Sequence, residues 1–120
     1  MSTYTDGFVL SIPKGKLDQY TALATKAAEI WREHGALEYR ECAGDDMDAK
    51  DMVSFPDMAK TNPDEIVIFA WATFKSREHR DEVNAKIMAD PRMASMCEQS
   101  GVVFDCSRMA YGGFKTIVSL

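Results

Sequence analysis

The stretch IVIFAWATF, residues 66–74, decides the fold because it is the most apolar run in the chain. Apolar side chains occupy both of its alternating faces, which is typical of a strand in the middle of a sheet. The side chains on one face are expected to lie against helices: Ile68, Ala70 and Ala72. The side chains on the other face are expected to lie on the open side of the sheet: Phe69, Trp71 and Thr73. The alternative is the reverse assignment, which would leave Ile68 and Phe74 on the open side instead.

The sequence before this strand predicts a strand, a helix and a second strand. Residues 7–13 alternate as a strand does. Residues 16–34 repeat apolar side chains at steps of three and four, as an amphipathic helix does. Gly35 is a typical residue for the end of that helix, and residues 36–43 then alternate as a second strand.

The sequence after residues 66–74 predicts two helices and a last strand. Ser76 is a good N-cap for a helix that runs to about residue 89. The pair Asp90-Pro91 then starts a short helix, because Asp suits the cap position and Pro suits the first turn. The last strand is expected over residues 108–118, where Gly112-Gly113 predicts a bulge or a close backbone approach.

This β-α-β-β-α-β order predicts an α+β, ferredoxin-like sandwich, with a four-stranded antiparallel sheet and helices on one face. We expect residues 1–120 to form a single domain, since this is an ordinary domain length. Leaving Phe69 and Trp71 in water costs about 25 cal/mol per Å² of apolar surface, and exposed apolar patches usually mark an interface. The open face therefore predicts a homodimer that packs sheet against sheet.

The charge and the apolar runs of the chain exclude two classes of partner. A net charge of −5 and a pI of about 5.0 oppose binding to nucleic acid or to an anionic membrane surface. The N-terminal residues MSTYTDGF lack the parts of a secretion signal, and no apolar run approaches the ~20 residues that cross a bilayer. We expect a cytoplasmic protein with neither nucleic acid nor membrane as a partner.

The segment of residues 44–65 is polar, with two prolines and many aspartates. Because so long a structureless connection is uncommon in a compact domain, we expect a lid, an arm that contacts a partner, or some local structure around residues 52–55. Its acidic side chains lack the spacing of an EF-hand, which favours a solvated loop over a metal site: Asp45, Asp46, Asp48 and Asp51.

Three cysteines, Cys42, Cys97 and Cys106, are irregularly spaced and odd in number. This pattern predicts neither a disulfide framework nor a zinc site. We expect reduced and mostly buried thiols, which is the usual state of free cysteine in a cytoplasmic protein.

Five long stretches follow one another along the chain: GFVLSIPKGKLDQY, AAEIWREHGALEYRECAGDD, VSFPDMAK, VNAKIMADPRM and RMAYGGFKTIV. Together they closely resemble the YbaA-like family of small bacterial proteins, known as domain of unknown function 1428. The resemblance implies a ferredoxin-like fold in the dimeric α/β barrel superfamily, which includes cofactor-free monooxygenases and ligand-binding domains. It supplies no catalytic residues, because none are defined for the family.

Five residues are candidates for a ligand pocket on the open sheet face. Arg40 is a candidate for binding an anion and Glu38 for orienting the ligand or acting as a base. Trp71 and Tyr111 are candidates for stacking on a planar ligand, and His34 for proton transfer. Each residue also has a purely structural interpretation. Glu38 and Arg40 would be a solvated pair on an edge strand, and Trp71 would be part of a dimer core. His34 would be a favourable charge at the C-terminal end of a helix.

The sequence thus favours a cytoplasmic homodimer with a candidate small-molecule pocket on its sheet face, no cofactor and no assigned activity. An alternative is an enzyme resembling a cofactor-independent monooxygenase, which acts on a small enolisable or aromatic substrate. There the protein would supply a base, an anion clamp and a dry cavity. A third reading is a dimer without catalysis, in which residues 44–65 contact the other protomer.

Overall fold

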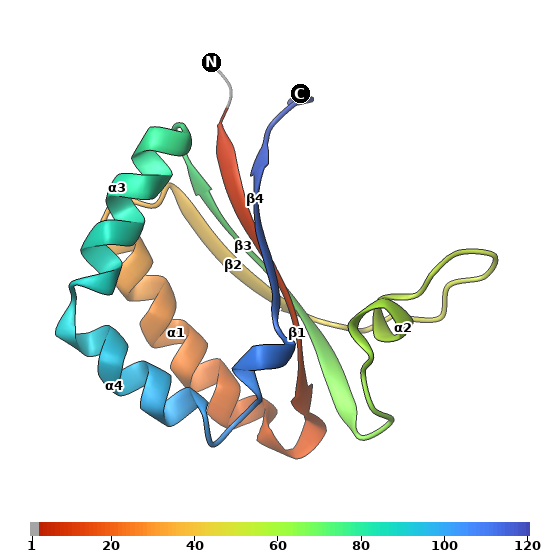
Figure 1. Cartoon of the computed structure of the whole chain (residues 1–120). Helices are drawn as coiled ribbons and strands as arrows, with labels where there is room; N and C mark the ends of the chain where they lie inside the picture. The colour runs from red at the N-terminus through yellow and green to blue at the C-terminus, as the bar shows by residue number, and fades with distance from the viewer. Residues whose placement is uncertain (1–2) are drawn as a thin grey trace.

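The computed structural model describes residues 3–120, apart from the side chain of Cys97, and shows a sheet with a layer of helices on one face (Figure 1). The sheet is antiparallel with the order β2-β3-β1-β4. Its strands are β1 (Tyr4–Pro13), β2 (Glu38–Ala43), β3 (Glu65–Phe74) and β4 (Ala110–Lys115). The helices over one face are α1 (Leu17–Glu33), α3 (Arg77–Met88) and α4 (Pro91–Ser100). The expected ferredoxin-like α+β fold is confirmed.

Strand β3 has the two faces that its sequence predicts. Ile68 and Ala70 are each 2% exposed and lie towards the helices, whereas Phe69 is 44% exposed on the open face. Two clusters of buried side chains fill the space between the sheet and the helices. One forms around Phe74 and Val83. The other combines Leu10, Ile12 and Ile68 of the sheet with Tyr20 of α1 and Val103.

The ends of the strands follow from their pairing. Strand β1 starts at Tyr4, three residues before the predicted start at residue 7, because Tyr4 still pairs with Phe74 of β3. Tyr4 also pairs with Lys115, which is the last pair between β1 and β4. Strand β4 therefore ends at Lys115 instead of continuing to residue 118.

A protruding arm joins β2 to β3 on the side of the sheet opposite the three long helices (Figure 1). It contains one short helix, α2 (Phe55–Ala59), which lies slightly later than the structure predicted around residues 52–55. The hydroxyl of Ser54 caps α2 by accepting a hydrogen bond from the backbone N–H of Asp57. The ring of Phe55 lies 5.9 Å from the ring of Phe69, so the arm contacts the open sheet face.

Two further predictions from the sequence need correction. Gly112 and Gly113 pair in regular register with β1, so the predicted bulge is wrong and the predicted close approach is right. Cys42 and Cys106 are free and exposed, not buried, because they lie on an edge strand and in a short 3-10 turn (Cys106–Arg108). The side chain of Cys97 lies outside the described part of the chain.

Among the described residues, no helix is both long enough and apolar enough to span a membrane.

The ring of Tyr4 leaves no room for a side chain at position 113, so we expect glycine to be required there. A Cβ atom at Gly113 would lie 2.7 Å from Cε2 of Tyr4, whereas a Cβ atom at Gly15 would meet nothing within 4 Å. We expect Gly113→Ala to lower the free energy of unfolding by about 1–3 kcal/mol. Gly15→Ala should change it by no more than about 1 kcal/mol. Urea unfolding of the two variants measures both values, and equal effects would contradict the crowding at Gly113.

Candidate functional site

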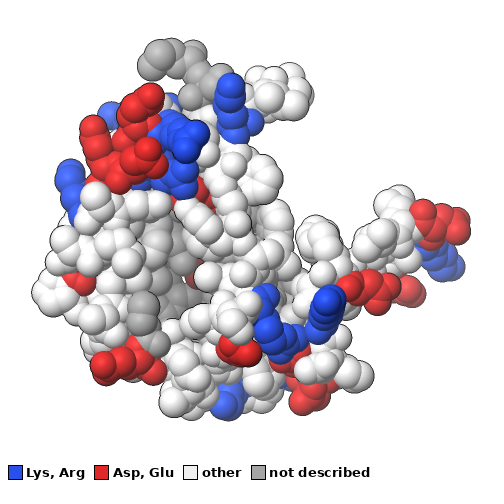
Figure 2. Space-filling view, in the orientation of Figure 1, with Lys and Arg blue, Asp and Glu red and all other residues white. Residues whose placement is uncertain are grey.

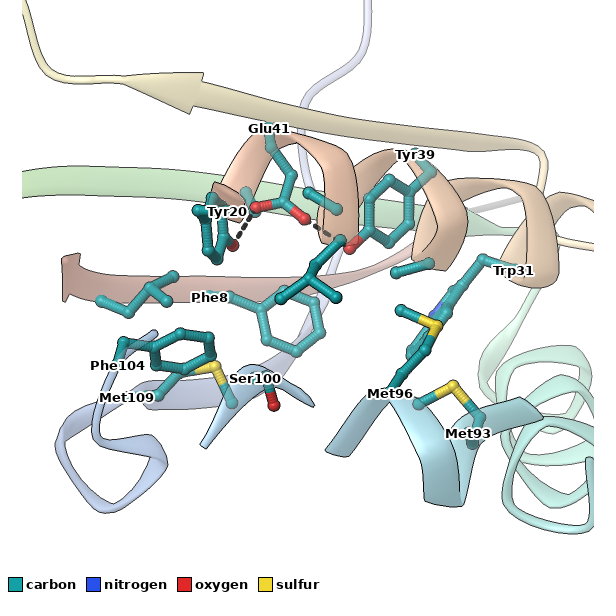
Figure 3. A pocket seen from close by; sticks show the side chains of 15 residues that line it. Phe8, Tyr20, Trp31, Tyr39, Glu41, Met93, Met96, Ser100, Phe104 and Met109 are labelled. Carbon is teal, nitrogen blue, oxygen red and sulfur yellow. Dashed lines mark hydrogen bonds between the residues drawn. The ribbon is translucent and has the colours of Figure 1, made fainter. Parts of the chain in front are cut away.

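A cavity of about 160 Å³ lies between the sheet and the helical layer. Its wall combines side chains from β1, β2, β3, α1 and α4 with others from the segment before β4 (Figure 3). Figure 2 shows the surface hollowed between these two layers. The lining is mainly apolar and aromatic, and includes Phe8, Leu23, Trp31, Met96, Phe104 and Met109.

One carboxylate, that of Glu41, lies on the wall of this cavity (Figure 3). The hydroxyls of Tyr20 and Tyr39 each donate a hydrogen bond to one of its two oxygens, and the Tyr39 bond measures 2.6 Å. The pKa values of Tyr20 and Tyr39 are raised far above their usual range. Burial is the larger cause, and the charge of the neighbouring Glu41 carboxylate is the second. Both hydroxyls therefore keep their hydrogens at any ordinary pH.

These three residues also line a second hollow, a groove between α1 and β2 of about 250 Å³. Exposed residues of both elements, such as Thr21 and Cys42, form its rim. Glu41 and the two tyrosines thus separate the apolar cavity from this groove.

The indole of Trp31 borders the same cavity, with its ring 5.6 Å from that of Tyr39. Its Nε1 atom is buried and has no hydrogen-bond partner within residues 3–120. A buried donor without a partner is uncommon in native structures and costs about 1–3 kcal/mol.

Three of the five predicted pocket residues lie together on the open sheet face. Trp71 donates a hydrogen bond from Nε1 to Oε1 of Glu38 over 2.7 Å. Arg40 lies 3.6 Å from the other Glu38 oxygen and 5.9 Å from the Trp71 ring centroid. The side chains of Arg40 and Glu38 are 60% and 46% exposed, so in the protomer this group meets solvent.

Tyr111 borders the same broad hollow as Trp71, but its side chain lies on the helical side of the sheet. It pairs directly with Phe8 in the register of β1 and β4, and its hydroxyl accepts a hydrogen bond from Arg80. On β4, the alternate residues Ala110, Gly112 and Phe114 face the open side of the sheet instead.

His34 also lies away from the open face, at the C-terminal end of α1. Its Nε2 atom is 2.8 Å from Oδ2 of Asp90, at the turn between α3 and α4. Arg92 bonds the same carboxylate at 2.7 Å and Glu33 at 2.6 Å. His34 thus belongs to a polar cluster that joins the end of α1 to the start of α4.

The sequence analysis missed two acidic residues on the helical side of the sheet, Glu41 of β2 and Asp6 of β1. Asp6 is only 1% exposed and accepts a hydrogen bond of 2.9 Å from Arg80. Burial raises the pKa of Asp6, and the charge of Arg80 opposes this shift. The sequence signal that could have found them is strand alternation, because residues two apart point to the same face of a sheet. Asp6 therefore shares a face with Phe8, and Glu41 shares a face with Tyr39.

Comparison with known proteins assigns the family. A family model described as protein of unknown function, DUF1428, matches residues 3–106. This chain belongs to the DUF1428 family. It is 41% identical over 115 residues to the uncharacterised protein YbaA of Escherichia coli K12, covering 96% of this chain and 97% of YbaA. YbaA of Shigella flexneri matches to the same extent.

Solved structures with the same fold are more distant from this DUF1428 chain. A NIPSNAP family protein of unknown function from Agrobacterium tumefaciens is 20% identical, with a TM-score of 0.57 over 96% of this chain and 87% of its own. A dimeric ferredoxin-like protein from an uncultured marine organism is 8% identical, with a TM-score of 0.57 over 100% and 98%. These similarities support the fold and carry no residue roles.

The cluster around Asp90 predicts a loss of stability in acid. Hydrogen bonds from Arg92 and then His34 lower the pKa of Asp90. A carboxyl whose pKa is lower in the folded chain stabilises the fold above the unfolded pKa, about 3.9, and this contribution disappears as the pH falls through the folded value. We expect Asp90→Asn to reduce the free energy of unfolding at pH 7 and to have a smaller effect at pH 3.

Chemical denaturation at the two pH values measures this difference. Asp48→Asn, in the exposed arm, is the matched control and should change little at either pH. An Asp90→Asn effect that is equal at pH 7 and pH 3 would contradict the role of the ionised carboxylate.

Proposed function

We propose that this protein is a homodimer that binds a small, mainly apolar molecule in the cavity between the sheet and the helices of each protomer. The observation that carries this proposal is a cavity of about 160 Å³ that none of the described side chains fills. Protein interiors are normally close-packed, and an apolar cavity of about 150 Å³ is large enough to hold benzene.

The chemistry of the lining supports a ligand site over a packing defect. Small-molecule sites are typically apolar and aromatic, with a few polar groups at fixed positions. Here Glu41 is the fixed polar group, because two tyrosines hold its carboxylate. Met93, Met96 and Met109 also line the cavity, and methionine adapts readily to ligands of different shape.

The open sheet face supports the homodimer. Phe69 is 44% exposed, Met58 57% and Phe114 61%, and all three border one broad apolar hollow on this face. The printed description of one structural neighbour is a dimeric ferredoxin-like protein. Packing two such faces together would remove these side chains from water, and Glu38 and Arg40 would lie near the edge of the contact.

A second candidate function is a cofactor-independent oxygenation of a small enolisable or aromatic substrate. The observation that favours it is the position of Glu41, a carboxylate held by two hydroxyls beside a mainly apolar space. Such a carboxylate is suited to accept a proton from a bound substrate. The exposed Glu38 on the open face is less suited, because water competes for its oxygens.

A larger side chain at Ala27 should block the cavity. Ala27 lies on α1 and lines the cavity, whereas Ala22 on the same helix is exposed. We expect toluene to raise the melting temperature of the wild type, because a ligand that binds only the folded state stabilises it. Ala27→Phe should abolish this rise, and Ala22→Phe should retain it. A rise that survives in Ala27→Phe, or no rise with toluene or benzyl alcohol in the wild type, would refute the cavity as the site.

A charge at Phe69 should break the dimer. Native mass spectrometry of the wild type should give twice 13.4 kDa, and Phe69→Asp should give the monomer, because burying an unpaired charge is costly. The control is Met88→Asp, at a residue of α3 that is 79% exposed on the helical side. It should remain a dimer. A monomeric wild type would reject the sheet-to-sheet contact.

A further inference from the structure

We infer that the cavity takes a molecule with a protonated amine, which binds to the wall formed by Glu41, Tyr20 and Tyr39. This inference rests on the proposed ligand site and names the chemical class that the site would select. It follows from the direction of the hydrogen bonds, the charge of the wall and the rings beside it.

The hydrogen bonds leave the wall with acceptors only. A tyrosine hydroxyl has one hydrogen, and the hydrogens of Tyr20 and Tyr39 both point to Glu41. An ionised carboxylate offers about four acceptor positions, of which the tyrosines use two. The remaining lone pairs of Glu41 and those of the two hydroxyl oxygens can receive hydrogens from a ligand. A ligand that brings donors is therefore matched to this wall, and one that brings only acceptors is not.

The charge of the wall favours a cation. Within the described part of the chain, no Lys, Arg or His forms an ion pair with Glu41. Asp6, on the same side of the sheet, has the guanidinium of Arg80 at 2.9 Å. Glu41 has neutral hydroxyls instead, which give each of its oxygens one hydrogen bond and leave its negative charge without a counterion. An ammonium group supplies that counterion, whereas a carboxylate or phosphate would be repelled.

Aromatic rings beside the wall add to this preference. The rings of Tyr20 and Phe104 lie 5.6 Å apart at one side of Glu41, and those of Trp31 and Tyr39 lie 5.6 Å apart at the other (Figure 3). Ring faces attract ammonium groups, and they do so more strongly where water is excluded. The Nε1 atom of Trp31 is itself buried, so an acceptor on the ligand reaches it only after a side chain moves.

The size of the cavity limits the rest of the molecule. About 160 Å³ accommodates a body close to a benzene ring. A primary amine on one ring, joined by a short linker, fits both the apolar lining and the polar wall. Benzylamine is a suitable probe of this class, with benzyl alcohol as the neutral match and benzoate as the anionic match.

Isothermal titration of the full chain with these three probes at pH 7.5 tests the inference. We expect benzylamine to bind about tenfold more tightly than benzyl alcohol, equivalent to about 1.4 kcal/mol, and benzoate to bind most weakly. Glu41→Gln should bring benzylamine and benzyl alcohol to similar affinity. Glu38→Gln is the matched control, because Glu38 belongs to the same strand but its side chain lies on the open face; it should leave the tenfold ratio unchanged.

The outcomes separate the inference from the proposed function. Equal binding of benzylamine and benzyl alcohol, or tighter binding of benzoate, overturns the amine preference while the cavity remains a ligand site. Absence of binding by all three probes in the millimolar range overturns both. If Glu41→Gln fails to fold, the wild-type comparison of the three probes still decides. A second check repeats the benzylamine titration of the wild type at a pH above the pKa of the amine. The affinity for the neutral amine should fall towards the affinity for benzyl alcohol.

Discussion

Because the long helices cover only one face of the sheet, the side chains of every strand are divided between two environments. Strand β3 fixes the division, because it pairs with β1 on one side and with β2 on the other. Its register decides that Tyr39 and Glu41 of β2 lie under the helices and that Glu38 and Arg40 lie on the open face. Two acidic residues of one short strand, Glu38 and Glu41, thus face different sides of the sheet and have different partners.

Asp6 and Glu41 are acidic residues of the sheet whose side chains lie towards the helices, and the chain stabilises them in different ways. Asp6 is paired with Arg80, so its charge is balanced within the protein. Glu41 receives two tyrosine hydroxyls, which satisfy its hydrogen-bonding capacity in part and leave its charge unbalanced. A carboxylate beside an apolar space is costly unless a partner compensates it. The contrast between the two residues is the physical basis for assigning a ligand role to Glu41.

The sequence predicted the fold well because its signals are local. The apolar run of β3, the cap at Ser76 and the Asp90-Pro91 pair each specify their own segment, and all three appear in the structure. The site was harder to predict, because it depends on register between strands. Alternation places Tyr111 and Ala110 on opposite faces, but only the pairing of Tyr111 with Phe8 shows which face meets the helices. The cavity itself depends on how α4 packs over the sheet, for which no short stretch of sequence carries a signal.

The wall formed by Glu41 and its two tyrosines has the cavity on one side and the groove between α1 and β2 on the other. Exposed residues line that groove, so bulk water reaches the wall from the side that a bound molecule does not occupy. Glu41 therefore lies between two hollows of different character, a mainly apolar cavity and a groove with exposed residues at its rim. A molecule that fills the cavity would cover one side of the carboxylate and leave the other side open to solvent.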